Sequence, residues 1–278
     1  MRTTAYRYPN ERLILAVTIC AALAVIALTA TATVCASVIF IILFVIISYN
    51  ASLAHHQEIL RAARQVTRRT DVRQPMPGLG ALVELGIRRI QPGPVEAYLL
   101  PSRELNAYTF GLGSPKVVVL YSALLEVMDE DEVLFILGHE LGHVALGHTW
   151  LNSLVGGLAG IPSSLSAAAL LTVTFLWWNR ACEYSADRAG LLACGRPEKA
   201  ISALVKLGAG PQAGSAQALQ RAYEQIDAED DTLMGSLNEA LGTHPMLIRR
   251  IERLRQYASS GQYRRLKEQI AGGYRRAE

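Results

Sequence analysis

The sequence is poor in cysteine and in net charge, and each shortage excludes a class of protein. Its 278 residues contain four cysteines, which are too few and too irregularly placed to form the disulfide framework of a small secreted domain. We therefore expect reduced, buried cysteines. The formal net charge is only +3, and no basic domain with interleaved aromatic residues accompanies it. This pattern argues against a nucleic-acid-binding protein.

Charged residues are absent from a long segment near the N-terminus, between Leu13 and Tyr49. A single helix of that length would measure about 55 Å, whereas the hydrocarbon core of a bilayer is about 30 Å thick. The apolar character weakens at Thr29-Ala-Thr-Ala-Thr33. The sequence therefore predicts that residues 1–50 form a membrane anchor, a transmembrane hairpin of two helices of about 17 residues each.

Arginines on both sides of this anchor predict its orientation. Because cytoplasmic flanks of membrane helices are enriched in basic residues, two basic flanks favour an even number of spans and place both ends of the anchor in the cytoplasm. We expect an integral protein of the plasma membrane, in contact with the lipid bilayer. The alternative is a cleaved signal peptide with Ala30-Thr-Ala32 as its processing site, but a second apolar run from Val34 to Ser48 argues against cleavage. The flanking arginines are Arg2, Arg7 and Arg12 before the run and Arg61, Arg64, Arg68, Arg69 and Arg73 after it.

The chain after the anchor is predicted to be mainly α-helical with a small antiparallel sheet, an α+β fold. Residues 51–80 form a basic juxtamembrane stalk that ends in a segment rich in proline and glycine. Short β-prone runs at 95–100, 107–110 and 117–121 predict the sheet. The acidic run Asp129-Glu-Asp-Glu132 favours the start of a long helix, where negative charge complements the helix dipole.

A second apolar stretch, residues 150–178, is interrupted by glycines and a proline and offers at most one convincing span. It ends in Trp177 and Trp178, which suit a membrane interface and a protein core equally well. From Pro197 onward the chain is predicted to form several helices, followed by a C-terminal tail at 259–278.

Two histidines one helical turn apart form the strongest motif in the sequence. In His139-Glu-Leu-Gly-His143 both imidazoles face one side of a helix, so both can reach a single metal ion. In zinc peptidases of this pattern, the glutamate at the position of Glu140 takes a proton from the attacking water. The motif predicts a metal site with a general base beside it.

A catalytic zinc site takes three protein ligands, so this motif lacks one. Glu183-Tyr-Ser-Ala-Asp187 places two carboxylates four residues apart on a second predicted helix, so both can face the first helix. Glu183 would complete the metal coordination. Asp187 would accept a hydrogen bond from the outer N–H of a metal-bound histidine and so fix its tautomer.

These motifs resemble those of the HtpX-like membrane zinc metallopeptidases, a family related to the CaaX prenyl protease group. The resemblance extends over residues 80–257 and keeps the motifs in the family's order. It rests on His139-Glu-Leu-Gly-His143, on Glu183-Tyr-Ser-Ala-Asp187 with the following Arg188-Ala-Gly190, on Asn106-Ala-Tyr-Thr-Phe-Gly111 and on Thr243-His-Pro245.

The resemblance implies a gluzincin with a zincin-like domain at 81–258, into which the apolar stretch 150–178 is inserted. It implies one zinc ion per chain and a protein or peptide substrate. The implied zinc ligands are His139, His143 and Glu183, and the implied base is Glu140. Asp187 would hydrogen-bond to one of the zinc-bound histidines.

The family also implies a substrate-binding strand and a further histidine. The strand that begins after Asn106, with Ala107 and Tyr108, would lie along the cleft and pair with an extended peptide. His244 would position the substrate or stabilise the oxyanion. The alternative for His244 is a turn-capping role before Pro245.

The chain departs from this family between its two metal-binding motifs. HtpX-like members usually carry two clear spans there, whereas residues 150–178 offer at most one. A single crossing would separate Glu183 from His139, so we expect a re-entrant or buried hairpin. The prenyl proteases carry still more spans, which argues against the processing of prenylated proteins.

Three other residues are expected to have structural roles and not to bind the metal. His148 follows His143 by five residues and would point off the ligand face of an ideal helix. Cys182 is expected to pack in the interior. Arg250 is expected to be solvated or to form a salt bridge.

The sequence therefore predicts a membrane-anchored zinc endopeptidase, with misfolded or damaged membrane proteins as its substrates. Two alternatives stay open. One is a membrane scaffold that keeps a metal site without catalysis, and the other is an extracytoplasmic protease whose anchor is cleaved or inserted in the opposite direction.

Overall fold

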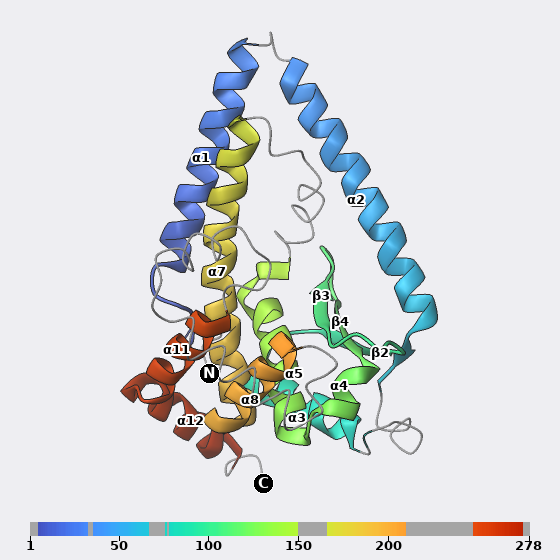
Figure 1. The fold of residues 1–278 in the computed structure, drawn as a ribbon, viewed down its shortest axis with the longest axis vertical. Helices are drawn as coiled ribbons and strands as arrows, with labels where there is room; N and C mark the ends of the chain where they lie inside the picture. Colours follow the sequence, from blue (N-terminus) through green and yellow to red (C-terminus); the bar gives the residue numbers. More distant parts are fainter. Residues whose placement is uncertain are drawn as a thin grey trace.

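The computed structural model describes residues 5–32, 36–66, 76, 78–149, 166–209 and 247–274. Figure 1 shows a base of helices with a small sheet, from which long helices rise. The predicted fold class, mainly α with a small sheet and an N-terminal helical hairpin, is confirmed.

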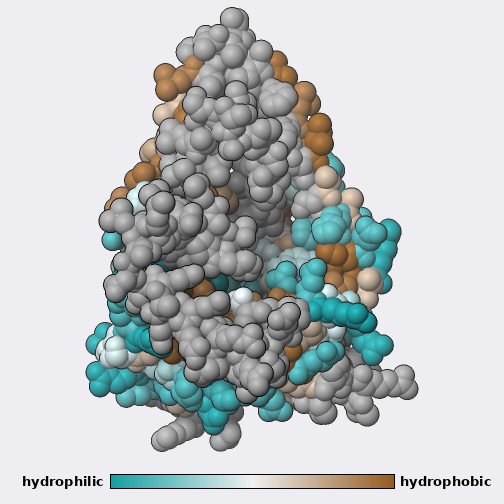
Figure 2. All heavy atoms as spheres, viewed as in Figure 1, coloured by the Kyte–Doolittle hydropathy of each residue, from teal (hydrophilic) through white to brown (hydrophobic). Residues whose placement is uncertain are grey.

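Two helices form the N-terminal hairpin. α1 spans Glu11–Ala32 and α2 spans Ala36–Ala62, and Figure 1 shows them diverging from a common tip toward the base. Both expose large apolar side chains, such as Leu23 at 60% and Ile47 at 66%. Figure 2 shows apolar flanks above a hydrophilic base. Among the described residues, the helical segment Glu11–Leu28 is long and apolar enough to cross a membrane.

The sheet contains four strands in the order β1-β2-β4-β3. The predicted strands are confirmed as β2 (Val95–Leu100), β3 (Ala107–Phe110) and β4 (Lys116–Tyr121), and β1 (Arg64–Gln65) adds to one edge. The prediction of a purely antiparallel sheet is wrong, because β2 and β4 run parallel. The chain does reverse after β2, but β4 returns from the β3–β4 hairpin to lie between β2 and β3. β2 therefore gains a parallel neighbour.

α5, Glu130–Leu146, carries the two predicted metal-binding histidines. The Asp129 side chain accepts a hydrogen bond from the Glu132 backbone N–H, and the Glu132 carboxylate accepts one from the Asp129 N–H. This capping box confirms the helix start predicted from the acidic run. Gly147, with a φ of 81°, ends the helix in the left-handed conformation that glycine adopts without strain.

α7, Ser166–Cys194, packs along α5 at close range. A Cβ added at Gly142 would lie 2.6 Å from an alanine of α7, and one added at Gly190 would lie 2.7 Å from the Phe135 carbonyl oxygen. Glycine at these positions lets the two backbones approach. The apolar half of α7 rises beside α1 (Figure 1). Residues 150–165, where the predicted hairpin would begin, lie outside the described residues.

The remaining described helices complete the base. The helices predicted after Pro197 are confirmed by α8 and α11. α12 occupies part of the segment expected as a C-terminal tail, and its Tyr263 ring packs against Tyr257. These helices are α3 (Leu79–Ile90), α4 (Ser122–Val127), α8 (Pro197–Ala209), α11 (Leu247–Ala258) and α12 (Gly261–Tyr274).

Candidate metal centre

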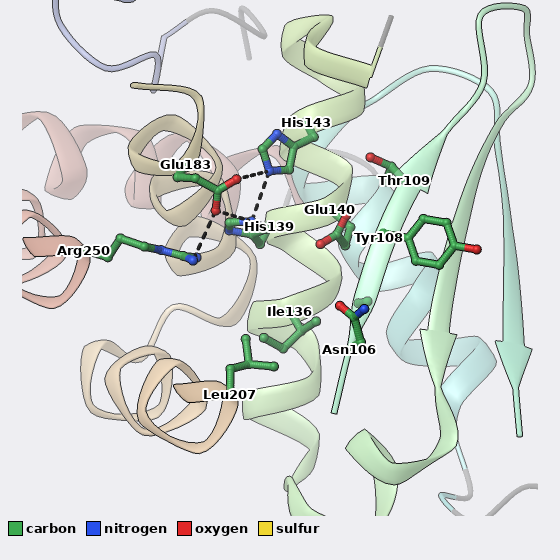
Figure 3. A pocket seen from close by; sticks show the side chains of 11 residues that line it. Asn106, Tyr108, Thr109, Ile136, His139, Glu140, His143, Glu183, Leu207 and Arg250 are labelled. Carbon is green, nitrogen blue, oxygen red and sulfur yellow. Dashed lines mark hydrogen bonds and ion pairs between the residues drawn. The ribbon is translucent and has the colours of Figure 1, made fainter. Parts of the chain in front are cut away.

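α5 and α7 bring the two predicted motifs together (Figure 3). The ligand atoms of His139, His143 and Glu183 all lie within 4.8 Å of one another. His143 Nε2 lies 3.1 Å from His139 Nε2 and 3.3 Å from Glu183 Oε1. Glu183 Oε2 lies 3.5 Å from His139 Nε2. Three side chains from two helices therefore form a compact triangle of ligand atoms.

The size of this triangle fits one tetrahedral metal ion. Ligand atoms about 2.0–2.1 Å from a tetrahedral zinc lie about 3.3 Å from one another. The three separations of 3.1, 3.3 and 3.5 Å lie close to that value. Two imidazoles and one carboxylate are also a donor set that zinc accepts, and three protein ligands leave a fourth position for water or substrate.

A partly buried ion-pair network holds the carboxylates of this site. The Arg250 guanidinium donates two hydrogen bonds to Asp187, of 2.7 and 2.8 Å, and lies 3.2 Å from Glu183 Oε2. The salt-bridging alternative for Arg250 is thus confirmed. Burial alone would raise the pKa of both carboxyls, but Arg250 and hydrogen bonds to the histidines hold the pKa of Glu183 well below its usual value and also lower that of Asp187. Both groups stay ionised at neutral pH.

Asp187 also orients His139. Its Oδ1 lies 2.9 Å from His139 Nδ1, which leaves Nε2 directed at the other two ligands. Burial lowers the pKa of His139, but hydrogen bonds and charge from Asp187 and Glu183 outweigh it and raise that pKa to about 10. A metal ion that binds here must therefore displace a proton from His139.

Glu140 lies beside the triangle, at a cavity of about 310 Å³. The cavity is lined by all three ligand side chains and by Leu207 of α8. Glu140 is only 7% exposed, and burial raises the pKa of its carboxyl. A raised pKa brings a carboxylate toward the range in which it can both take up and release a proton at neutral pH.

The strand β3 forms the wall of the cavity opposite α5 (Figure 3). Asn106, Ala107 and Tyr108 line the cavity together with Thr109, so the structure places the predicted substrate-binding residues beside the metal triangle. Figure 3 shows the Tyr108 ring on the side of the strand away from the histidines. In the described part of the chain, no strand pairs with the other edge of β3. An extended peptide could pair with that edge.

His148 contacts His143 rather than the metal position. Its Nδ1 lies 2.9 Å from His143 Nδ1, and its Nε2 lies 3.1 Å from Glu11 Oε1. The predicted structural role of His148 agrees with these contacts, but its ring lies against His143 and does not point away from the ligands. The helix ends at Leu146, and the turn at Gly147 brings the His148 ring back to His143. Burial lowers the pKa of His148 to about 2, so the ring is neutral.

Glu11 is the contact residue that sequence reasoning missed. It lies 137 positions from His148 and next to an apolar run, where an acidic residue resembles an ordinary membrane flank. Gly147 was the available signal for His148, because a glycine that ends a helix also ends helical periodicity. His244 lies outside the described residues, so its role stays a prediction.

A known protein family matches the region that contains this site, and several known proteins are similar to the chain. The family description "Peptidase family M48" matches residues 82–258. The chain is 28% identical over 185 residues to "Plastoglobule-localized metallopeptidase 48, chloroplastic" of Arabidopsis thaliana, a match that covers 62% of this chain and 54% of that protein. It is 27% identical over 214 residues to the "Protease HtpX homolog" of Syntrophotalea carbinolica, covering 64% of this chain and 75% of that protein.

A third relative is the "Protease HtpX homolog" of Methanopyrus kandleri, which is 29% identical over 189 residues, or 55% of this chain and 56% of that protein. The chain thus spans about half the length of the plant relative and of this one. No solved structure matches the chain.

Proposed function

Because the chain belongs to peptidase family M48, we propose that it is a membrane-anchored zinc endopeptidase that hydrolyses peptide bonds in proteins. One observation carries the proposal. His139, His143 and Glu183 form a triangle of the size that a single zinc ion needs, and Glu140 lies beside it at a cavity. Two histidines and one carboxylate form the ligand set of many zinc peptidases, which is why we propose zinc over other divalent ions.

The chemistry follows from the positions of these side chains. A zinc ion bound by the three ligands would polarise the scissile carbonyl and lower the pKa of the attacking water. Glu140 takes the proton from that water and passes it to the leaving amine. Asp187 keeps the Nε2 of His139 directed at the metal position, and Arg250 keeps Glu183 ionised.

The substrate would bind as an extended strand against β3. Backbone hydrogen bonds to the strand edge near Asn106, Ala107 and Tyr108 would hold the peptide across the cavity, so recognition would depend weakly on side-chain sequence. His244 is proposed to position the substrate or to stabilise the oxyanion, as in the family it resembles.

The anchor would hold this site at the cytoplasmic face of the plasma membrane. Exposed apolar side chains on α1 and α2 support insertion in a bilayer, and arginines at both ends of the apolar run support an even number of spans. A protease held beside the bilayer suits misfolded or damaged membrane proteins, and we propose these as substrates.

Zinc content and cleavage of casein, measured together on the detergent-purified protein, test the function. Wild type is expected to hold about one zinc ion and to cleave, whereas Glu140→Gln is expected to hold zinc and to lose cleavage, because the amide cannot accept the proton. Glu130→Gln changes an exposed carboxylate in the first turn of the same helix and should behave as wild type.

Each other result rejects part of the proposal. Zinc in both proteins with cleavage in neither would favour the scaffold, and absence of zinc from both would reject the site. Full cleavage by Glu140→Gln would reject the role of the base. Activity of an alkaline phosphatase fused to the C-terminus would contradict the cytoplasmic orientation.

A further inference from the structure

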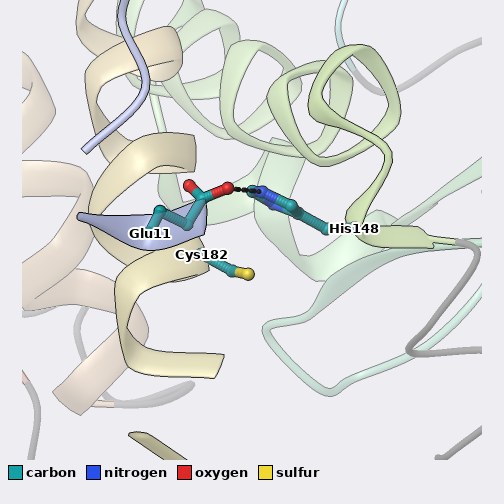
Figure 4. A group of neighbouring side chains, drawn as sticks. All are labelled: Glu11, His148 and Cys182. Carbon is teal, nitrogen blue, oxygen red and sulfur yellow. Dashed lines mark hydrogen bonds and ion pairs between the residues drawn. The ribbon is translucent and has the colours of Figure 1, made fainter. Parts of the chain in front are cut away.

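The first residue of α1, Glu11, lies close to the proposed metal centre and contacts it through His148. Figure 4 shows Glu11, His148 and Cys182 facing one another. Glu11 is 1% exposed and His148 is 2% exposed. One ring nitrogen of His148 lies 3.1 Å from Glu11 Oε1 and the other lies 2.9 Å from His143 Nδ1. A chain of contacts therefore joins the first residue of the N-terminal helix to a proposed metal ligand.

The direction of each hydrogen bond in this chain follows from metal binding. When His143 binds a metal ion through Nε2, its Nδ1 carries a proton and must donate. His148 Nδ1 must then accept, so the proton of the neutral His148 ring lies on Nε2, which donates to the Glu11 carboxylate. Only this arrangement of protons satisfies both contacts.

Glu11 is itself held in place by the segment before α1 and by α7. Arg7 forms an ion pair with it, and the Ser185 hydroxyl donates to its second oxygen. Arg7 also donates to the Leu146 carbonyl oxygen at the end of α5, at 3.0 Å, and the Tyr8 backbone N–H donates to Ser185 Oγ at 2.8 Å. The N-terminal segment thus contacts both helices that carry the proposed ligands.

We propose that Glu11 and His148 are positioning residues of the metal centre and form a relay that fixes the tautomer and orientation of His143. This inference rests on the proposed zinc site, and it adds that α1 is a structural part of that site as well as an anchor. Partners of the outer N–H of a metal-bound histidine commonly contribute about 10- to 100-fold to metal affinity. Asp187 contacts His139 directly, whereas Glu11 acts on His143 through a second imidazole.

The same side chains could instead hold a second metal ion, because the ligand atoms of Glu11, His148 and Cys182 lie within 4.8 Å of one another. Two observations favour the relay. Arg7 already neutralises Glu11. His148 Nε2 carries a proton whenever His143 binds zinc, so it has no lone pair for a second ion. Cys182 takes part in the alternative site but not in the relay, and it therefore supplies a control.

The zinc affinity of the full chain in detergent tests the relay. His148→Phe keeps an aromatic ring and removes both nitrogens, and we expect zinc affinity to fall about 10- to 100-fold. His148→Gln keeps one acceptor and one donor and should recover part of that loss. Cys182→Ala should keep wild-type affinity and about one zinc per chain. Affinity is measured by competition with a chromophoric chelator, and the unfolding temperature of each metal-free protein is recorded.

The visible spectrum of the cobalt-substituted protein adds a readout that general destabilisation does not change. We expect the spectrum to shift in His148→Phe and to stay unchanged in Cys182→Ala. If wild type holds no zinc, the proposed function fails. If wild type holds zinc and His148→Phe binds it within about twofold of wild type with an unchanged cobalt spectrum, the relay alone fails. A second zinc in wild type that Cys182→Ala loses would also overturn the relay.

Nitrogen-15 NMR of histidine-labelled wild type decides the question even if His148→Phe does not fold. In the zinc-loaded protein we expect His148 as the Nε2–H tautomer, with its signals assigned by their loss in His148→Gln. The Nδ1–H tautomer would overturn the relay, because His143 could then not donate to it.

Discussion

The helix pairs α5–α7 and α1–α2 are both rich in apolar residues, but they depend on their surroundings in different ways. α5 and α7 approach through glycines such as Gly142 and Gly190, and the charged groups at their contact are paired. α1 and α2 instead leave large apolar side chains exposed, including Leu23 and Ile47. The first pair is specified by contacts between named atoms, whereas the outer faces of the second pair need only an apolar medium around them. Substitutions should therefore have large effects in the first pair and small effects on the outer faces of the second.

Removal of the countercharge at the α5–α7 contact should have the largest effect. Arg250→Met leaves Asp187 buried at 2% exposure without its guanidinium partner. The two carboxylates Asp187 and Glu183 then share a single cation, the protonated His139, so one negative charge stays uncompensated. Because such a charge is strongly destabilising in the interior, we expect the unfolding free energy of the metal-free protein to fall by about 3 kcal/mol. Urea unfolding in detergent, followed by tryptophan fluorescence, measures the change.

Arg253→Met is the matched control for that experiment. Arg253 is exposed on the same helix, and its side chain bonds to Gln256. Its replacement should change the unfolding free energy by no more than about 0.5 kcal/mol. Equal effects of the two substitutions would mean that Arg250 stabilises α11 itself and not the carboxylates.

A methyl group at a close backbone contact between α5 and α7 should have the next largest effect. In Gly190→Ala the new Cβ would lie 2.7 Å from the Phe135 carbonyl oxygen and 2.8 Å from its ring. Backbone must move to relieve this overlap, so we expect a loss of about 1–3 kcal/mol and weaker zinc binding, as α7 and Glu183 shift away from α5. Gly261→Ala, whose Cβ would meet only an arginine side chain at 4.0 Å, should be close to neutral in the same unfolding assay.

Much of the metal centre could be predicted because its signals are local. The spacing of His139 and His143 places both on one helical face, and the acidic run that begins at Asp129 marks where that helix begins. Glu183 and Asp187 share one face of α7 for the same reason. Helical periodicity and end signals act over a few residues, and a single sequence displays them directly.

The parts that could not be predicted depend on contacts between distant segments. Nothing near Glu11 in the sequence indicates that it will meet His148, 137 positions away. The parallel pairing of β2 and β4 depends in the same way on which later strand pairs with the edge of β2. Strand periodicity shows which faces are apolar, but it does not show which edges meet.

The pH dependence of zinc binding should sharpen the contrast further, because it depends on the charged groups between α5 and α7 and not on the outer faces of α1 and α2. His139 has its pKa raised to about 10, so it is protonated in the metal-free protein at neutral pH, whereas the lowered pKa values of Glu183 and Asp187 keep them ionised. Zinc must displace the His139 proton, so affinity should rise about tenfold per pH unit between about pH 7 and 9. Titration calorimetry in buffers of different ionisation enthalpy should show about one proton released per zinc ion. If no proton is released, His139 is not protonated in the metal-free protein, and the prediction is wrong.

The smallest effect is expected on the outer face of α1. Leu23→Ala truncates a side chain that is 60% exposed. The surrounding detergent can fill the vacated space, so the unfolding free energy should change by no more than about 0.5 kcal/mol. Ile14→Ala, on the same helix, truncates a side chain that is 8% exposed and packs in the cluster with Trp178, and it should cost about 2 kcal/mol because it leaves a cavity. If Leu23→Ala costs as much as Ile14→Ala, the outer face of α1 is covered by protein, and the difference between the two helix pairs disappears. If only Ile14→Ala is costly, α1 has one face that packs in the protein and another that is free to meet lipid.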